Sequence, residues 1–413
     1  MSGPRGTAPP MVDSLHEIAV ALCRADAAEC VRGRLGPLAD ADFTRRLIVL
    51  LRRHGVMGLA AATLTSRPLA TALPEEVRVE LQAIVSRLRR RAALWILERD
   101  RILSILQQAG ITPVMLKGGG LSTTLYAEPL QREFGDLDLL VPEDQFDRTV
   151  ARLLDSGYEN PWNALQLEGY RRHHFHLRLT HPGGFIVEVH FRLSARDAPF
   201  RLDAGEFLAQ SVMHDTAREA VLRLPRPEHQ LLHMVAQNAT DAFNQLVRLV
   251  DIDRLVRAHP QLQWDVVERA ARHGGLKSAV AMSLHLTRTL LAAPIPESIL
   301  RRFDPGRVTR FHLVILRPVP WLLREHFARR PAAARLLTVW IIPHHGDRWR
   351  FLARRDPIEW IWSGREQLAE HDQSRWGGLI SLAKLLLYQV GVYLSGAAAV
   401  VTPRGRAELR YRS

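Results

Sequence analysis

The chain has 413 residues, of which 47% are hydrophobic and 24% charged, with two cysteines and a formal net charge of +13. This composition excludes an intrinsically disordered chain and a small disulfide-stapled domain, and the length allows two or three domains. The positive charge predicts anionic partners such as nucleotides, nucleic acid or acidic lipid, although arginines spread along solvated helix faces would give the same total.

The first region, residues 1–109, is predicted to be helical. Apolar residues recur at spacings of three and four, as between Val77 and Leu88, a pattern typical of amphipathic helices. The last of these helices is expected to end at about Gln108, close to Gly110. No residue in this region indicates a chemical function.

Residues 110–222 are predicted to form a small α/β core, because short apolar runs alternate with turn residues. The expected elements are a strand that begins near Thr112, a turn at Lys117–Gly120, a short helix Leu121–Tyr126, a strand Phe134–Val141, a helix from Pro142 to about Ser156, and a β-hairpin that turns at His181–Gly184. Helical periodicity returns in residues 223–413. The sequence therefore predicts an α+β fold, in which a small mixed β-sheet is flanked by N-terminal and C-terminal helical regions.

Three acidic residues are expected to converge on one face of the sheet. Asp136 and Asp138 point the same way along their strand, because side chains alternate between the two faces. Glu188 and His190 share the polar face of the second hairpin strand, and Glu188 completes the cluster if the two strands are neighbours. Clustered carboxylates of this kind prefer Mg²⁺ or Mn²⁺, ions that assist in-line displacement at phosphorus.

A second set of residues is predicted to bind the nucleotide phosphates. Glycines allow the backbone to approach an anion closely, and the helix that follows them offers N–H groups at its positive end. Basic, hydroxyl and imidazole side chains add charge and hydrogen-bond donors. The residues assigned to nucleotide binding are Lys117, Gly118, Gly119, Gly120, Ser122, Arg132 and His190.

The stretch VMLKGGGLSTTLYAEPLQREFGDLDLLVPEDQF resembles the core of the polymerase-β-type nucleotidyltransferase superfamily. In particular it resembles the bacterial family described as uncharacterised nucleotidyltransferases, with a Leu-Lys-Gly start, a Leu-Tyr pair, an Arg and then Gly-Asp-x-Asp-x-Leu-Val. IVEVHFRL resembles that family's hairpin strand, which carries the third carboxylate and a His. The specific part of the resemblance covers Val114–Leu193 and implies a nucleotidyltransferase core.

The resemblance also implies roles for individual residues. Asp136 and Asp138 would be metal ligands, Glu188 the third acidic residue, and Gly118 with Gly119 the phosphate-binding turn. The chain departs from the broader superfamily in three ways. The gap between the glycines and the acidic pair is longer, no serine directly follows the first glycine, and Glu replaces the more common Asp at the third acidic position.

The predicted function is metal-dependent transfer of a nucleoside monophosphate from an NTP to a hydroxyl or phosphate acceptor. The acceptor is expected to be a small molecule, a polysaccharide precursor or a peptide product. Two alternatives stay open: a catalytically inactive nucleotide-binding regulatory protein, and a nucleotidyltransferase acting on RNA ends. Scattered arginines do not favour nucleic acid, which would require basic residues gathered beside the cleft.

Other polar residues are interpreted structurally. His173, His174 and His176 are expected to line the sheet or to be satisfied within it, and a zinc site is not favoured, because ligands spaced along one strand do not close a tetrahedral set. Asp251 is expected to pair with a nearby arginine such as Arg248 or Arg254.

Two features bear on location. The two cysteines and the absence of a basic-then-apolar leader predict a cytoplasmic protein. Residues 377–401 form an apolar segment that is long enough to span a membrane, although Lys384 lies within it. Peripheral membrane contact through this segment is kept as an alternative to a buried helix. Five tryptophans of the C-terminal region are interpreted as core residues, namely Trp340, Trp349, Trp360, Trp362 and Trp376.

Overall fold

Helices and one mixed β-sheet make up the part of the chain that the computed structural model describes, namely residues 11–34, 36–71, 73–160, 174–195, 198–215, 220–241 and 243–303. The expected α+β class is confirmed. Residues 377–401, the five tryptophans between Trp340 and Trp376, and His173 lie outside these ranges. Among the described helices, none combines the length and the apolar character needed to cross a membrane.

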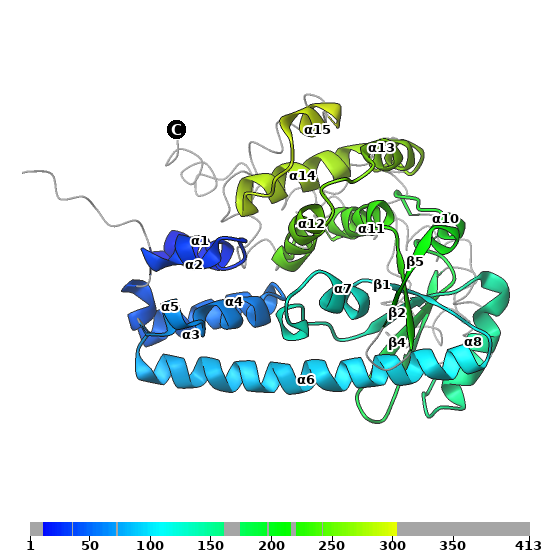
Figure 1. Cartoon of the computed structure of the whole chain (residues 1–413), viewed down its shortest axis with the longest axis horizontal. Helices are drawn as coiled ribbons and strands as arrows, with labels where there is room; N and C mark the ends of the chain where they lie inside the picture. Colours follow the sequence, from blue (N-terminus) through cyan, green and yellow to red (C-terminus); the bar gives the residue numbers. More distant parts are fainter. Residues whose placement is uncertain are drawn as a thin grey trace, which may run out of the picture. The chain divides into compact units, whose positions relative to one another are not determined.

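The N-terminal region is helical, as predicted. Its helices are α1 (Met11–Ala21), α2 (Ala27–Arg32), α3 (Ala41–Arg53), α4 (Met57–Leu64), α5 (Arg67–Ala70) and α6 (Glu75–Gln108), with a 3₁₀ turn η1 at Gly36–Ala39. The apolar patterns expected near Val77 and near Gln108 belong to a single helix, since α6 has 34 residues and contains neither glycine nor proline. It ends just before Gly110, whose φ of +71° suits glycine. Figure 1 shows α6 passing both the N-terminal helices and the sheet.

The sheet has six strands in the order β3-β4-β2-β1-β6-β5. The strands are β1 (Val114–Leu116), β2 (Leu137–Leu140), β3 (His176–Thr180), β4 (Ile186–His190), β5 (Ser211–Asp215) and β6 (Val221–Pro225). Parallel pairs β2–β4 and β1–β6 alternate with antiparallel pairs β3–β4, β1–β2 and β5–β6. The β5–β6 hairpin was not predicted, and β6 continues to Pro225, past the expected end of the core at residue 222.

The two faces of the sheet are covered differently. On one face, α6 and α8 (Phe146–Leu154) bury a large core with side chains such as Leu103, Leu139 and Val187. On the other face, Phe207 of α10 (Ala204–Ala209) packs on a smaller apolar group that includes Leu140. Asp138 is two residues before Leu140, so it points to this second, less apolar face.

The Lys117–Gly120 stretch differs from its expected form. The turn was expected to extend to Gly120, but α7 (Gly118–Thr124) begins at the first glycine, and Lys117 has a φ of +53°. All three glycines are buried in the first turn of α7. A Cβ on Gly118 would lie 2.5 Å from Phe134 Cβ, and one on Gly119 would lie 2.8 Å from Leu137 Cδ2. The glycines thus let this helix pack closely on the sheet.

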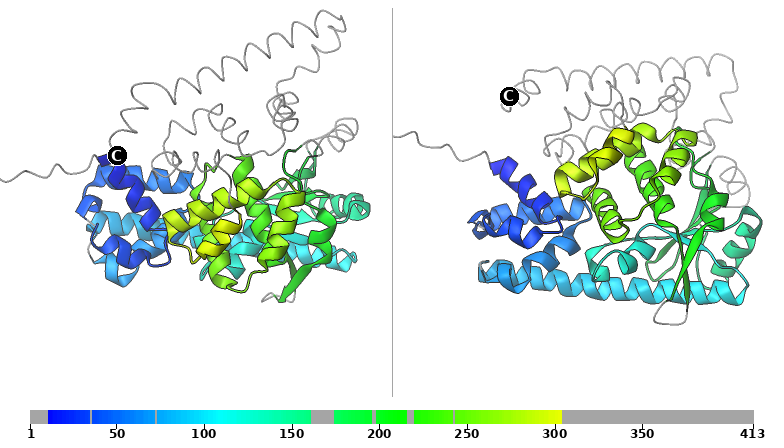
Figure 2. Two further views of the ribbon diagram at one scale, coloured as in Figure 1. Left: turned by 90° about the horizontal axis from the view of Figure 1, so that it is seen from above. Right: turned by 45° about the horizontal axis from the view of Figure 1, so that its top comes forward.

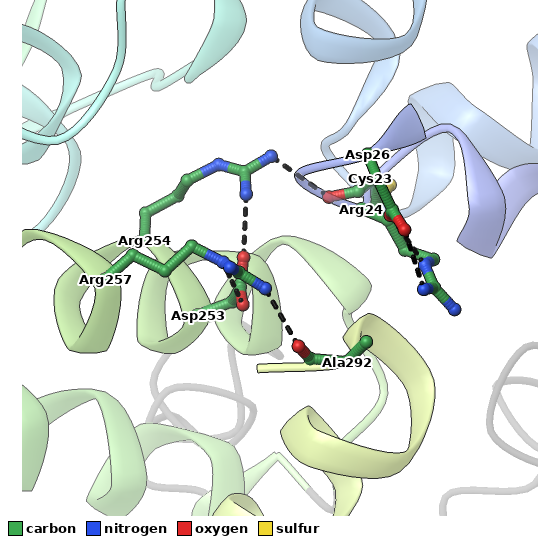
Figure 3. A network of polar contacts seen from close by, with 7 residues as sticks. All are labelled: Cys23, Arg24, Asp26, Asp253, Arg254, Arg257 and Ala292. Atoms are coloured by element: carbon green, nitrogen blue, oxygen red, sulfur yellow. Dashed lines mark hydrogen bonds and ion pairs between the residues drawn. The ribbon is translucent and has the colours of Figure 1, made fainter. Parts of the chain in front are cut away.

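The C-terminal part of the described chain is helical, as predicted. Its helices are α11 (Pro227–Thr240), α12 (Leu246–Ala258), α13 (Trp264–His273), α14 (Lys277–Leu291) and α15 (Glu297–Arg302). In α12, Asp253 accepts hydrogen bonds from Arg254 and Arg257, and Arg254 also donates to the Cys23 carbonyl near the end of α1 (Figure 3). The bond from Arg254 joins α12 to the segment after α1, and both views of Figure 2 show the dark blue N-terminal helices next to the yellow-green C-terminal ones.

Candidate active site

Asp138 and Glu188 are neighbours across the sheet. Parallel pairing of β2 with β4 places the two residues opposite each other in register, so their side chains project from the same face. Asp138 is buried, and Glu188 is partly exposed. The strand pairing on which the predicted carboxylate cluster depended is therefore present, and its polar face holds both residues.

Two histidines complete this polar face. His190 lies two residues after Glu188 on β4, and His176 pairs with His190 across β3–β4. His190 Nε2 is 3.0 Å from Asp138 Oδ1 and 3.5 Å from Glu188 Oε2, while His176 Nε2 is 3.7 Å from Glu188 Oε1. The predicted sharing of one face by Glu188 and His190 is confirmed. His176 was interpreted only as a lining or structural residue, and the structure brings it to the acidic cluster.

Lys117 supplies positive charge at the same point. Its Nζ contacts Asp138 Oδ1 in a short ion pair and lies 3.9 Å from Glu188 Oε2. Although burial opposes its charge, the nearby carboxylates raise the pKa of Lys117. Burial works against ionised Asp138 as well, yet the charges of Lys117 and His190 hold its pKa well below the usual range. Asp138 is thus fixed as an anion between an ammonium and an imidazole.

Asp136 has the opposite electrostatic environment. It precedes β2 and is partly buried, and burial together with the negative charge of Asp138 raises its pKa to about 6. Burial of His176 lowers the pKa of that imidazole to about 3, with the neighbouring His190 adding to the effect. The cluster therefore contains three carboxyl groups beside Lys117 and His190, and the carboxyl group of Asp136 is reluctant to ionise without an additional cation.

Donor atoms are available for such a cation. Asp138 Oδ2 is buried and has no hydrogen-bond partner within the described ranges. His176, Glu188 and His190 each offer one ligand atom, and these three atoms lie within 4.8 Å of one another. Oxygen and imidazole donors at this spacing fit a divalent ion.

The residues predicted to hold phosphates are placed differently from one another. Gly118, Gly119 and Gly120 follow Lys117 in the first turn of α7, with their Cα atoms packed on the sheet. Ser122 is fully buried, and its Oγ has no hydrogen-bond partner among the described residues. Lys117 and His190 are the members of this set that contact the acidic cluster directly.

Arg132 is tied to the helical region. Its Nε donates to both carboxylate oxygens of Asp251 at 2.8 and 3.0 Å, and Tyr126 Oη donates to the same carboxylate at 2.6 Å. The expected partners of Asp251 were wrong, because Arg248 pairs with Asp241 and Arg254 with Asp253. The prediction considered only arginines close to Asp251 in sequence. The arginine that pairs with Asp251 is Arg132, which lies in the turn before β2.

One positioning residue was missed entirely. Arg99, buried on α6, pairs with Asp100 and donates to the Gly119 carbonyl and to Thr123 Oγ1, both at 3.1 Å. These hydrogen bonds hold α7 against α6. The sequence did contain a sign of this role, because Arg99 and Asp100 are adjacent opposite charges among the apolar residues of α6. Charges that are buried in a protein are normally paired in this way.

A cavity of about 20 Å³ lies next to Lys117, enough space for an ordered water. It is bounded by the start of α7, by α11 and by α12. The polar lining residues include Lys117, Arg132, Gln230, His233, Arg248 and Asp251. Helices α11 and α12 form one wall of this cavity.

Comparison with known proteins gives one family. A family model described as an uncharacterised nucleotidyltransferase matches residues 41–292. The matched range begins with α3, includes the whole sheet and ends after α14. A comparison with curated proteins finds none that matches the chain.

Proposed function

The chain belongs to this family of uncharacterised nucleotidyltransferases, and we propose that it transfers a nucleoside monophosphate from an NTP to a hydroxyl or phosphate acceptor with the help of Mg²⁺. The family match supports nucleotidyl transfer in general. The observation that carries the finer proposal is the convergence of Asp138 and Glu188 from neighbouring strands, with Lys117 between them. A bacterial source and membership of the polymerase-β-type superfamily stay predictions from the sequence.

In this proposal Asp136, Asp138 and Glu188 hold Mg²⁺. The unpartnered Oδ2 of Asp138 and the raised pKa of Asp136 support a cation here, since ionised Asp136 is favoured only once its charge is compensated. Bound Mg²⁺ supplies stabilisation of the charge on the α-phosphate and on the departing pyrophosphate. The carboxylates of the chain fix the position of the ion.

The basic residues of the chain bind and orient the triphosphate. Lys117 leaves Asp138 and donates to phosphate oxygens, and Arg132 adds positive charge from the turn before β2. His190 keeps the Asp138 carboxylate in one orientation through its 3.0 Å contact. Gly118, Gly119 and Gly120 with Ser122 form the remaining phosphate-binding segment. Helices α11 and α12 of the C-terminal region provide the second wall around base and acceptor.

The acceptor belongs, in this proposal, to the biosynthesis or modification of a small molecule, a polysaccharide precursor or a peptide. The use of an NTP and the two free cysteines support a cytoplasmic location.

The proposal is tested by nucleotide consumption. The full chain, Mg²⁺, each labelled NTP in turn and a cell extract are incubated, and labelled products are separated. We expect one NTP to be consumed by wild type and not by an Asp136→Asn/Asp138→Asn variant, whereas Asp144→Asn, an exposed carboxylate, keeps activity. A wild type that binds nucleotide without consuming it would instead support the inactive regulatory alternative.

A further inference from the structure

We propose that His176, Glu188 and His190 form a separate cation site that takes a divalent first-row transition ion beside the carboxylate pair. The inference deepens the proposed function, and any role of this ion in catalysis rests on that function. The site shares Glu188 with the carboxylate cluster and differs from it in using His176 and His190 in place of Asp136 and Asp138.

The antiparallel hairpin creates this set of ligands. His176 on β3 is paired in register with His190 on β4, and Glu188 lies two residues earlier on the same face of β4. Ligands taken along one strand would be about 7 Å apart. Pairing across two strands closes that gap, which is why the spacing in the sequence alone argued against a metal site.

The separations suit direct coordination. His176 Nε2 to Glu188 Oε1 is 3.7 Å, and His190 Nε2 to Glu188 Oε2 is 3.5 Å. Two ligands bound tetrahedrally at 2.0–2.1 Å from one ion are about 3.4 Å apart. The two imidazole rings lie nearly parallel, with an interplanar angle of 28° and centroids 4.9 Å apart. Small side-chain rotations would therefore complete the site.

Two of the buried polar atoms beside this site have no hydrogen-bond partner among the described residues. His190 is 1% exposed, and its Nδ1 has no hydrogen-bond partner in the described ranges. Asp138 Oδ2, on the adjacent strand, is equally buried and also lacks a partner there. Buried polar atoms without partners are costly, and an ion or an ordered water near the cluster is the usual explanation for them.

The imidazoles also decide which ion fits. Mg²⁺ prefers oxygen ligands and retains water, whereas imidazole favours transition ions such as Zn²⁺, with Mn²⁺ able to use both donor types. Lys117 contacts Asp138 and is 3.9 Å from Glu188 Oε2. The ammonium thus occupies the Asp138 side, and the transition ion would bind on the histidine side of Glu188.

The test measures the ligands of bound Mn²⁺ directly. The full chain is treated with EDTA, dialysed and titrated with Mn²⁺ alone, and the complex is studied by electron spin-echo spectroscopy, which detects nitrogen bound to the ion. We expect couplings from imidazole nitrogen that change when histidine is labelled with ¹⁵N. Zn²⁺ should displace the Mn²⁺, whereas Mg²⁺ at the same concentration should not.

Variants locate the site. His176→Gln should weaken Mn²⁺ binding by at least about tenfold and reduce the nitrogen signal, while His181→Gln, in the turn of the same hairpin, should leave both unchanged. Mn²⁺ bound without nitrogen coupling, or lost only in Asp138→Asn, would overturn the histidine site and leave the carboxylate proposal standing. Failure of the chain to bind Mn²⁺ would also overturn it. The ¹⁵N experiment on wild type decides the question even if a variant fails to fold.

Discussion

Asp138 on β2 and Lys117 at the end of β1 form an ion pair at the centre of the polar face, and Glu188 Oε2 lies 3.9 Å from the same ammonium. The Lys117 ammonium therefore compensates carboxylates that the proposed reaction requires for a metal ion. Cation binding and this internal pair compete for Asp138, which makes the balance between them measurable.

Replacing Lys117 by Met should destabilise the metal-free protein and increase its response to Mg²⁺ or Mn²⁺. Asp138 would be left buried without its ammonium partner, at a cost of about 1–3 kcal/mol, less than for a fully enclosed pair because Lys117 is 25% exposed. A bound divalent ion would restore the compensation. Thermal unfolding with EDTA and with added metal measures both effects.

Lys277→Met is the matched control, because Lys277 is exposed at the start of α14. It should unfold like wild type under both conditions. If Lys117→Met were as stable as wild type in EDTA and gained no more from metal, Lys117 would not be compensating Asp138.

Asp136→Asn should stabilise the metal-free protein above pH 6. The pKa of Asp136 is raised to about 6, so its contribution to stability is present below about pH 4, the pKa of an unfolded aspartate, and is lost as the pH rises through 6. Asparagine avoids this loss, so the variant should exceed wild type by about 1–2 kcal/mol at pH 8 and match it below pH 4. Denaturant unfolding in EDTA at several pH values measures the difference.

Addition of Mg²⁺ should stabilise wild type more than Asp136→Asn, because the variant lacks one of the three carboxylates proposed to bind the ion. A variant less stable than wild type at pH 8 in EDTA would contradict the assigned environment of Asp136.

Asp251→Asn should destabilise the protein by about 3–5 kcal/mol, since it leaves Arg132 buried without its anion. Asp251 is 2% and Arg132 12% exposed, and the pair links the turn before β2 to α12. Glu297→Gln, which breaks an exposed pair with Arg288, should have a much smaller effect on stability. Equal losses in urea unfolding would show that the buried pair has no special importance.

Gly118→Ala should destabilise the protein by about 1–3 kcal/mol through overpacking. The new Cβ would lie 2.5 Å from Phe134 Cβ, an atom that side-chain rotation cannot move away. Gly33→Ala is the control, because its Cβ would meet nothing within 4 Å and its φ is −79°. The free energy of unfolding in urea is measured for both variants. A loss in Gly118→Ala alone would show the effect of tight packing, whereas equal losses would show a general cost of replacing glycine.

The sequence predicted the polar face because strand alternation is a local property. Asp138, Glu188 and His190 follow from a period of two, and only the pairing of β2 with β4 had to be assumed. The extent of α6 was harder to assign, although its uninterrupted run without glycine or proline was present in the sequence.

Contacts between distant segments could not be predicted in this way. Arg132 with Asp251 and Arg99 with Gly119 join residues 119 and 20 positions apart, and nothing in the spacing of either pair identifies its partner. His176 lies in the cluster only because the register of the β3–β4 hairpin pairs it with His190. The packing of the three glycines on the sheet likewise depended on side chains from other elements.

The central claim is that carboxylates on β2 and β4 support transfer of a nucleotide. Mass spectrometry of products formed from an NTP labelled at the α-phosphate, in the presence of Mg²⁺ and cell extract, tests it most directly. The account predicts an acceptor that gains one nucleoside monophosphate, with release of pyrophosphate, by wild type and not by Asp138→Asn. Transfer of the γ-phosphate alone, or the same product from the variant, would contradict it.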